Sequence, residues 1–443
     1  MIEEVVALAE NLEPTALIGE GGIGKTLIAL TVFHHSRVEE RFGGNRRFIR
    51  CDQFPASRVH FLARLSKAIG AGLEDPDDLT PLRPFLSSKE ILIILDNADS
   101  ILDTQDTNGE IYWVVNELCE FKTVSLLITS RTSTVPSYCK RPEIPALSME
   151  AACDILSDNY GYGGHSGIIN DLLQRVDFHP LSITLLAATA SHNGWDYDQL
   201  AKEWDAQWAQ ALQTDSNEKL AATIEISLAS PTFHGLGPNV RDLLGVVAFF
   251  PQGIDEKSLD WLFPTTSNRK NIFDKFCALS LAHRSNGFIT MLAPIRDYFS
   301  PRDPRSSPLL CATRDRYFSR LSVDVDPDKP GFKETQWILL EDMNIEHLLD
   351  VFMSIDPDKG DIWDACYHFI EHLYWHKPRQ TILGSKIKAL VEYRSIELDY
   401  LSELSRLFGR VRKHAERKML LAHTLGLQGR RGDDREVVQK FNC

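Results

Sequence analysis

The chain has 443 residues, of which 43% are hydrophobic and 25% are charged, and its formal net charge is -14. This length is too great for one compact core and predicts about three domains, while the composition is that of a soluble globular protein. The negative charge disfavours non-specific binding of nucleic acid by the chain as a whole, so we expect no nucleic-acid partner.

Cysteine usage and the first residues indicate a cytoplasmic protein. The eight cysteines are scattered without a C-x-x-C pair, so the sequence predicts neither a zinc ribbon nor a disulfide framework. The start, MIEEVVALAEN, is acidic where a signal peptide is basic, and the apolar run Leu243–Phe250 is too short to span a bilayer. We therefore expect no membrane partner. The abrupt start and end suggest a fragment of a longer protein.

The stretch TALIGEGGIGKT, at Thr15–Thr26, matches the phosphate-loop pattern G-x-x-x-x-G-K-[ST]. Apolar residues before the loop predict a strand, and those after it predict a helix whose N-terminus favours an anion. Glycines let backbone N–H groups approach phosphate oxygens; the lysine would reach the β- and γ-phosphates and the threonine would ligate Mg²⁺. The predicted nucleotide-binding residues are Gly19, Gly21, Gly22, Ile23, Gly24, Lys25, Thr26 and Leu27.

Strand and helix patterns alternate around this loop, which predicts a parallel sheet with helices on both faces. In such a sheet, ligands lie beyond the C-terminal ends of the strands. The predicted elements are a helix at Glu3–Asn11, a strand at Arg47–Cys51, a helix at Val59–Ile69, a strand at Ile91–Leu95, a helix at Ile111–Phe121 and a strand at Thr123–Thr129.

Two charged residues follow strands at that edge of the sheet. Asp96 ends an apolar run, and a carboxylate there is what a Mg²⁺ site in a phosphate-loop fold needs. Arg131 follows the last strand, where a cation can stabilise phosphate charge. Alone, the aspartate could cap the next turn and the arginine could be a solvated surface residue, but the phosphate loop favours the site roles.

From Ser148 the strand signals disappear and helices follow, until a hairpin turning at Ser285–Gly287 indicates a winged-helix unit. The predicted helices are Ile168–Asp177, Pro180–Ala190, Leu200–Leu212, Ala221–Leu228, Arg241–Phe250, Glu256–Phe263, Ile272–Leu281 and Pro294–Phe299.

Three prolines at Pro301, Pro304 and Pro308 mark a boundary, after which paired helices suit the start of a solenoid of repeats. The predicted helices are Cys311–Leu321, Asn344–Phe352, Ile362–His376, Leu383–Val391, Tyr400–Phe408 and Arg412–Leu425. The predicted domains are a phosphate-loop nucleotide-binding domain at 1–147, a helical subdomain at 148–235, a winged-helix-like domain at 236–300 and a helical region at 301–443.

The order GEGGIGKT, LDNAD, LLITSR and FHPLSI, followed by a winged-helix-like segment, resembles the NB-ARC module of STAND-class NTPases. It is most similar to the fungal type that carries tetratricopeptide-like repeats, and the resemblance covers the chain to about residue 299. It implies a signal-transduction switch in which ADP holds a closed form, while exchange for ATP opens it and permits self-association. The repeat-like C-terminal helices would then contact protein partners.

The resemblance also implies roles for single residues. Lys25 and Thr26 would bind phosphate and Mg²⁺, and Asp96 would be the Walker B metal carboxylate. Arg131 would be the sensor arginine near the γ-phosphate. Pro180 matches the proline of the GLPL motif that packs near adenine, although it could equally be the first residue of a helix.

Two departures from the family pattern bear on mechanism. The position of a second acid after Asp96 is Asn97, whose amide cannot act as a general base, and the geometry of Asp99 is not given by sequence. The family's M-H-D motif aligns with Met291–Ala293, where both polar residues are missing, and Arg296 is a candidate to replace them.

We therefore predict an ATP/ADP-binding switch and oligomerisation scaffold whose hydrolysis is slow or uncertain. Two alternatives remain open: a non-catalytic protein-interaction scaffold with structural ADP, and a constitutive phosphate-loop ATPase. A GTPase is less favoured because the sequence has no N-K-x-D signature, and a small-molecule kinase does not account for the long helical tail.

Overall fold

A computed structural model of the chain gives two compact units. Unit 1 comprises residues 1–56, 68–71 and 78–313, and unit 2 comprises 57–67, 72–77 and 314–443. The structure describes residues 1–54, 56–71, 78–103, 109–160, 167–213, 219–237, 239–324, 336–356, 360–376 and 383. The helices predicted at Tyr400–Phe408 and Arg412–Leu425, and all but the first residue of the one at Leu383–Val391, lie outside these residues.

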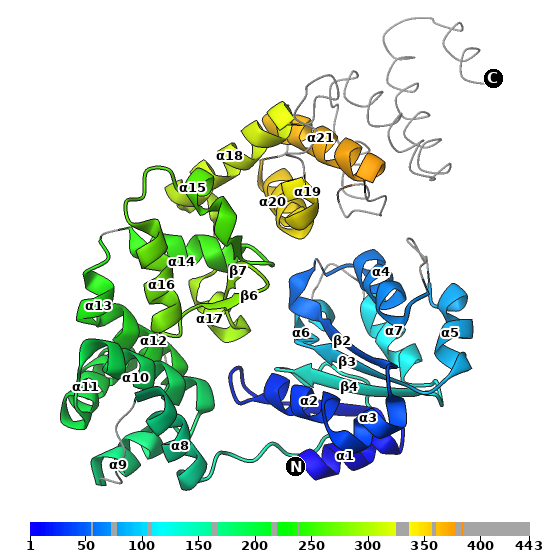
Figure 1. Cartoon of the computed structure of the whole chain (residues 1–443), viewed down its shortest axis with the longest axis horizontal. Helices are drawn as coiled ribbons and strands as arrows, with labels where there is room; N and C mark the ends of the chain where they lie inside the picture. Colours follow the sequence, from blue (N-terminus) through cyan, green and yellow to red (C-terminus); the bar gives the residue numbers. More distant parts are fainter. Residues whose placement is uncertain are drawn as a thin grey trace, which may run out of the picture. The chain divides into compact units, whose positions relative to one another are not determined.

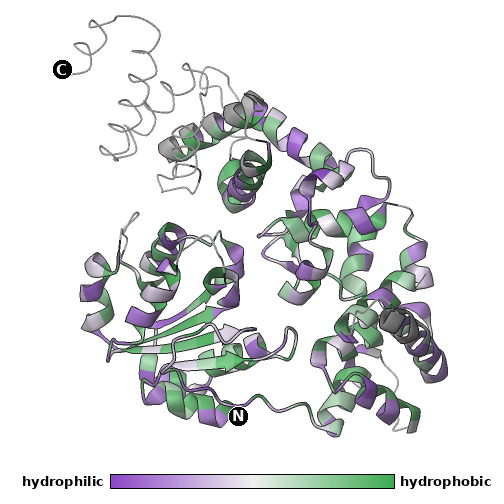
Figure 2. Cartoon of the chain, turned by 180° about the vertical axis from the view of Figure 1, so that it is seen from behind, coloured by the Kyte–Doolittle hydropathy of each residue, from purple (hydrophilic) through white to green (hydrophobic). Residues whose placement is uncertain are grey.

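Unit 1 begins with a four-stranded parallel sheet in the order β1-β4-β3-β2, which confirms the predicted fold class (Figure 1). Strand β3 is buried along its whole length, as its uninterrupted β-branched and leucine pattern predicts. Strands β1, β3 and β4 are mainly hydrophobic, whereas three of the five residues of β2 are arginines (Figure 2). Their bounds are β1 Thr15–Ile18, β2 Arg46–Arg50, β3 Ile91–Asp96 and β4 Val124–Ser130.

Helices cover this sheet because both of its faces are apolar. On one face, Leu17, Leu92 and Leu127 form a core with the first three helices. Alternate residues such as Ile93 and Ile128 point to the opposite face and are also fully buried. The helices of this part are α1 Ile2–Glu10, α2 Lys25–Phe33, α3 Ser36–Phe42, η1 Cys51–Gln53, η2 Thr80–Leu82, α5 Arg83–Ser88, α6 Asp99–Leu102 and α7 Glu110–Leu118.

An all-helical segment follows, centred on α10, which packs against α8 and α12. Helix α10 has small or apolar residues all round, including Leu186 and Ala190, and this lets neighbouring helices approach closely. Ser148 caps α8 through its hydroxyl, which accepts a hydrogen bond from the N–H of Ala151. The bounds are α8 Met149–Tyr160, α9 Gly167–Arg175, α10 Pro180–Asn193, α11 Tyr197–Gln213, α12 Lys219–Ala229 and α13 Pro231–His234.

Residues 240–299, here called the hairpin lobe, combine helices with an antiparallel sheet in the order β5-β7-β6. The predicted hairpin is confirmed, and Asn286 and Gly287 form its turn with positive φ. Strand β5 was not predicted, because two residues carry no alternation. The bounds are α14 Val240–Phe249, β5 Ile254–Asp255, η4 Glu256–Ser258, α15 Leu259–Leu262, α16 Arg269–Ala278, β6 His283–Ser285, β7 Phe288–Thr290 and α17 Ala293–Phe299.

Unit 2 groups a helix from early in the sequence with the C-terminal helices. Helix α4 precedes β3 along the chain, yet most of it belongs to unit 2, where His60 Nε2 lies 3.1 Å from Glu346 Oε2. None of the helices in the described ranges has both the length and the apolar character needed to cross a membrane. The remaining bounds are α4 Arg58–Ile69, η5 Pro304–Ser306, α18 Pro308–Asp324, α19 Gln336–Leu340, α20 Asp342–Ile355 and α21 Gly360–His376.

Candidate nucleotide-binding site

The phosphate loop joins β1 to α2 and is closed by Lys25. Gly22 and Gly24 have φ values of 89° and 99°, in the left-handed region that glycine adopts without strain. Lys25 Nζ donates hydrogen bonds of 2.7 Å to the carbonyls of Gly19 and Glu20. Burial lowers the pKa of Lys25 to about 8. The glycine backbone of the loop therefore lies at the start of α2, as a phosphate-binding loop requires. Leu27, which was also predicted to contact the nucleotide, is 68% exposed.

The two predicted Mg²⁺ ligands are in direct contact. Thr26 Oγ1 and Thr129 Oγ1 each donate a 2.7 Å hydrogen bond to Asp96 Oδ1. Asp96 Oδ2 is buried and has no hydrogen-bond partner among the described residues. Burial raises the pKa of Asp96, and the two threonine bonds oppose that rise. A buried, unpartnered carboxylate oxygen beside a hydroxyl fits Mg²⁺, which prefers few protein oxygens and completes its shell with water and phosphate.

Two residues that follow Asp96, Asn97 and Asp99, make hydrogen bonds to residues of strand β4 and to Arg131 after it. Asn97 has a φ of 56°, and its N–H donates to Thr129 Oγ1. Asp99 is 4% exposed and accepts from the backbone N–H of Arg131 at 3.1 Å and from its Nε at 2.6 Å. Arg131 therefore lies at the predicted strand end and is held there by Asp99.

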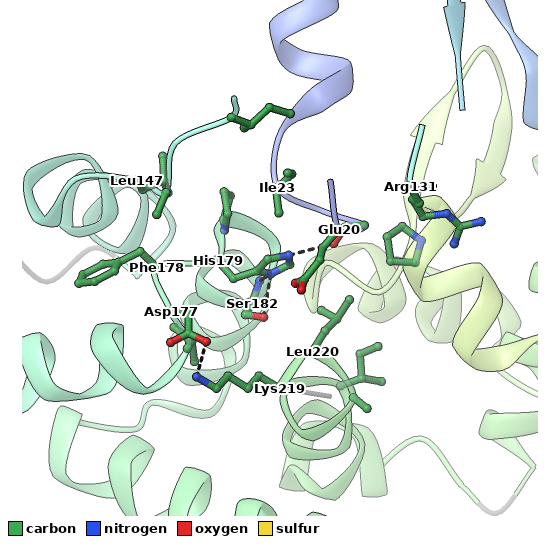
Figure 3. Close-up of a pocket in the computed structure, with 18 of the residues that line it drawn as sticks. Glu20, Ile23, Arg131, Leu147, Asp177, Phe178, His179, Ser182, Lys219 and Leu220 are labelled. Atoms are coloured by element: carbon green, nitrogen blue, oxygen red, sulfur yellow. Dashed lines mark hydrogen bonds and ion pairs between the residues drawn. The ribbon is translucent and has the colours of Figure 1, made fainter. Parts of the chain in front are cut away.

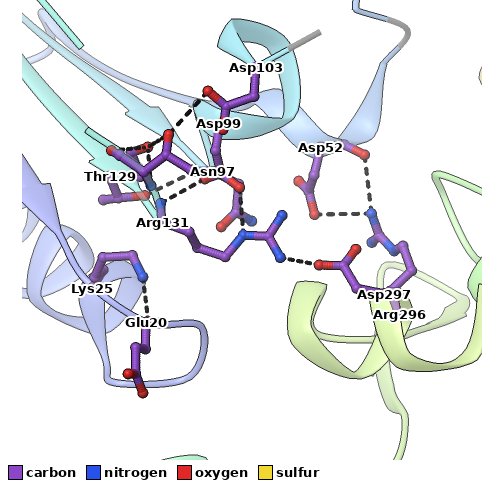
Figure 4. A network of polar contacts seen from close by, with 12 residues as sticks. Glu20, Lys25, Asp52, Asn97, Asp99, Asp103, Thr129, Arg131, Arg296 and Asp297 are labelled. Carbon is purple, nitrogen blue, oxygen red and sulfur yellow. Dashed lines mark hydrogen bonds and ion pairs between the residues drawn. The ribbon is translucent and has the colours of Figure 1, made fainter. Parts of the chain in front are cut away.

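Helix α17 of the hairpin lobe places two consecutive charged residues over this edge (Figure 4). Arg296 Nη1 lies 3.3 Å from both Asp52 Oδ2 and the Asp52 carbonyl oxygen. Asp297 pairs with Arg131 Nη1. Sequence reasoning missed Asp52 and Asp297, since nothing in the local pattern marks either residue as a contact of a segment so far away in the chain.

The same helix approaches the phosphate loop. A Cβ atom added to Gly21 would lie 2.5 Å from Pro294 Cγ, so only glycine fits there without a shift. Of the positions that align with the M-H-D motif, Leu292 is 43% exposed. The polar contacts at this edge come instead from Arg296 and Asp297.

Helix α10 contacts the loop from the other side through His179 (Figure 3). The Ser182 N–H donates to His179 Nδ1 at 3.3 Å, so the neutral ring carries its proton on Nε2 and donates to the Gly21 carbonyl at 2.9 Å. Burial lowers the pKa of His179, which favours this neutral form. His179 was missed because histidine is not among the common N-cap residues, although the following Pro180 does mark a helix start.

A cavity of about 800 Å³ lies beside the loop. Pro180 lines it, as do Glu20 and Gly21 of the loop, and its apolar lining suits a flat base or ring. The other apolar lining residues are Ile23, Ile144, Pro145, Ala146, Leu147, Val176, Phe178, Leu220, Ala221, Ile224 and Pro294. Pro180 is also the first residue of α10, as the alternative interpretation expected, and its contact with adenine stays a prediction.

Comparison with known proteins identifies this first part of the chain. Residues 1–162 match the NB-ARC domain family. The match covers 162 of the 443 residues, so the similarity to an NB-ARC domain concerns this region and not the chain as a whole. The match confirms the resemblance stated from the sequence motifs, whereas the fungal type stays a prediction. The matched region contains the phosphate loop and the four-stranded parallel sheet described above.

Solved structures that are similar to this chain include two ATPases from Pyrococcus species. One is a signal transduction ATPase with numerous domains, with a tetratricopeptide repeat sensor, from Pyrococcus horikoshii, at 11% identity and a TM-score of 0.51. The match covers 97% of this chain and 64% of that protein, so this chain spans less than two thirds of its length. The other is a Walker-type ATPase of Pyrococcus abyssi, at 13% identity and a TM-score of 0.34, covering 67% of this chain and 94% of that one. No curated protein sequence matches the chain significantly. At these identities the likeness concerns the fold.

Proposed function

We propose that the chain is an ATP/ADP-binding NTPase that acts as a nucleotide-dependent conformational switch. The nucleotide phosphates would lie on the loop at Lys25, Mg²⁺ would be held by Thr26 and Asp96, and the base would enter the cavity beside Pro180. When bound, Mg²⁺ would neutralise phosphate charge. The observation that carries the switch is the Arg131 guanidinium, which is divided between Asp99 of its own domain and Asp297 of the hairpin lobe.

The physical argument concerns competition for one cation. A switch needs a ligand that interacts differently with two conformations. ATP differs from ADP by the γ-phosphate, and Arg131 occupies the position predicted for its sensor. A γ-phosphate at Arg131 would compete with the Asp297 carboxylate, whereas ADP would leave that ion pair intact. ATP would therefore weaken the attachment of the hairpin lobe.

The size of this effect follows from solvent exposure. The side chains of Arg131 and Asp297 are 34% and 52% exposed. A pair so accessible to water stabilises the closed arrangement by about 1 kcal/mol or less. A factor of about five in the population of the open form corresponds to that energy. The lobe would be held weakly enough for one phosphate to release it, which would permit self-association and contacts of the C-terminal helices with protein partners.

The test uses Asp297→Asn, with Asp274→Asn as its matched control. Asp274 also pairs with an arginine, Arg284, in the hairpin lobe. The side chains of Asp274 and Asp297 are both about half exposed. We expect Asp297→Asn to speed the release of a fluorescent ADP analogue by up to about fivefold and to increase ATP-dependent self-association, measured by light scattering. The control should behave like the wild type.

Two results would oppose the proposal. Equal ADP release from both variants would show that the Arg131–Asp297 pair does not hold the closed form. A wild-type chain that binds neither ATP nor ADP would refute nucleotide switching altogether. Bound ADP that never exchanges would instead favour the scaffold with structural ADP, an alternative supported by the full engagement of Asp99 by Arg131.

A further inference from the structure

The acids nearest to Asp96 in sequence are poorly placed to activate water. Hydrolysis needs a group that accepts a proton from the attacking water. Asn97 is an amide, and Asp99 accepts two hydrogen bonds from Arg131. A base, if the site has one, must come from another element at the same edge of the sheet.

The short helix η1, which follows strand β2, supplies such a group. Arg50, at the end of β2, is the register partner of Asp96 in β3, so Asp52 lies just beyond the same edge. Burial raises the pKa of Asp96, and the nearby Asp52 carboxylate acts in the same direction, which places the two acids within electrostatic reach of each other.

The Asp52 carboxylate is buried and only partly satisfied. Its side chain is 3% exposed, and Oδ2 contacts Arg50 Nη2 at 3.1 Å and Arg296 Nη1 at 3.3 Å. Its other oxygen, Oδ1, is buried and has no hydrogen-bond partner among the described residues. A buried carboxylate oxygen without a partner is costly, so its retention calls for an explanation. Asp96 Oδ2 is in the same condition, and the proposed Mg²⁺ would account for it.

We propose that Asp52 is the general base for ATP hydrolysis and that Arg296 restrains it in the closed form. This inference rests on the proposed binding of ATP. Asp52 Oδ1 would take one proton from water while the water oxygen forms a bond to the γ-phosphorus. The bond from the γ-phosphorus to the bridging oxygen breaks, and its electron pair leaves with ADP. The proton then passes from Asp52 to solvent, giving ADP and inorganic phosphate.

Arg296 would keep this base inactive. Its guanidinium contacts both the carboxylate and the main-chain carbonyl of Asp52, so it fixes the side chain in place while the hairpin lobe is docked. Because Arg296 lies on α17, displacement of the hairpin lobe would free Asp52. Hydrolysis would then follow opening, and the switch would reset itself after it has been activated.

The experiment compares two variants that remove the same ion pair. Phosphate release is measured in single turnovers from bound, radiolabelled ATP, so that binding is separated from chemistry. We expect Arg296→Ala to raise the rate several-fold and Asp52→Asn to lower it by about 100-fold or more, the usual contribution of a general base. Asp52→Glu should retain measurable turnover because it keeps a carboxylate, and Asp274→Asn should match the wild type.

Each other outcome overturns the assignment. If Asp52→Asn and Arg296→Ala change the rate in the same direction, Asp52 only anchors the lobe. If wild type and Arg296→Ala bind ATP and release no phosphate, the chain has no base and the switch proposal stands alone. If neither binds ATP, the nucleotide-binding proposal has failed first. If Asp52→Glu is as inactive as Asp52→Asn while both bind ATP, a carboxylate at this position does not act as the base.

Discussion

Acid should loosen the contact between α10 and the phosphate loop because docking buries the His179 ring, and burial disfavours its protonated form. Its Nδ1 accepts the Ser182 N–H at the helix N-terminus, and its Nε2 donates to the Gly21 carbonyl. A protonated ring has no lone pair on Nδ1, so the bond to Ser182 is lost. The perturbation we propose is a change of pH, with His179→Asn as the variant that cannot respond to it.

The sign follows from the direction of the shift. Burial lowers the pKa of His179 below its ordinary value of 6.5. Below pH 6.5 the detached form binds a proton that the docked form does not, so docking weakens as the pH falls. The loss reaches at most about 1.4 kcal/mol, a factor of ten, per pH unit, and it stops growing below the pKa of the docked form. Above pH 7.5 this group contributes no pH dependence.

Hydrogen exchange measured by mass spectrometry on peptides from α10 and the phosphate loop reports this opening directly, once intrinsic exchange rates are corrected. Asparagine is a strong N-cap, so His179→Asn keeps the cap and loses the Gly21 bond, at a cost of about 1 kcal/mol at pH 7.5. Between pH 6.5 and 5.5 the wild type should open up to tenfold more, and the variant much less.

The difference in pH dependence between the wild type and His179→Asn reports on His179 alone. Burial also lowers the pKa of His283, with help from Arg50 and Arg296, but that histidine is present in both proteins and cancels. Equal pH slopes in wild type and His179→Asn would refute the reasoning, because they would show that the His179 ring does not titrate with docking.

Two further predictions concern the loop. With the pKa of Lys25 near 8, ADP affinity measured by calorimetry should fall by up to tenfold between pH 8 and 9, whereas Lys25→Arg, which stays charged, should show a flat profile. Gly21→Ala should speed ADP release at least threefold, because its Cβ meets Pro294, and Pro294→Ala should restore much of the slow release. A pH-dependent Lys25→Arg profile, or no rescue by Pro294→Ala, would count against these contacts.

The parts of the fold that sequence predicts are those encoded locally. The apolar run of β3 and the glycine pattern of the loop specify a strand and a turn whatever surrounds them. The sequence could predict that Thr26 and Asp96 lie close together, because the C-terminal ends of parallel strands meet at one edge of the sheet. In the structure, Thr26 Oγ1 donates a 2.7 Å hydrogen bond to Asp96 Oδ1. Predicting this contact required only the topology of the sheet and not the way in which separate segments dock.

Contacts between docked segments could not be predicted in the same way. Asp297 lies 166 residues after Arg131, and Arg296 lies 244 after Asp52. Each is one charged residue on a short amphipathic helix, indistinguishable in sequence from a solvated position. The grouping of α4 with unit 2 is hidden for the same reason, since the amphipathic pattern of α4 records that one face is buried and not which segment covers it.

The two ion pairs made by α17 are expected to break together because both depend on the position of this helix. Arg296 and Asp297 are consecutive, and they reach the ends of β2 and β4, which are the two neighbours of β3 in the sheet. One short helix thus bridges the strand end that carries Asp96. Because the two residues are consecutive on one helix, a displacement of α17 that breaks the Arg131 pair would also strain the Asp52 pair. A γ-phosphate that draws Arg131 away from Asp297 would therefore release, in the same movement, the carboxylate that we assign to its hydrolysis.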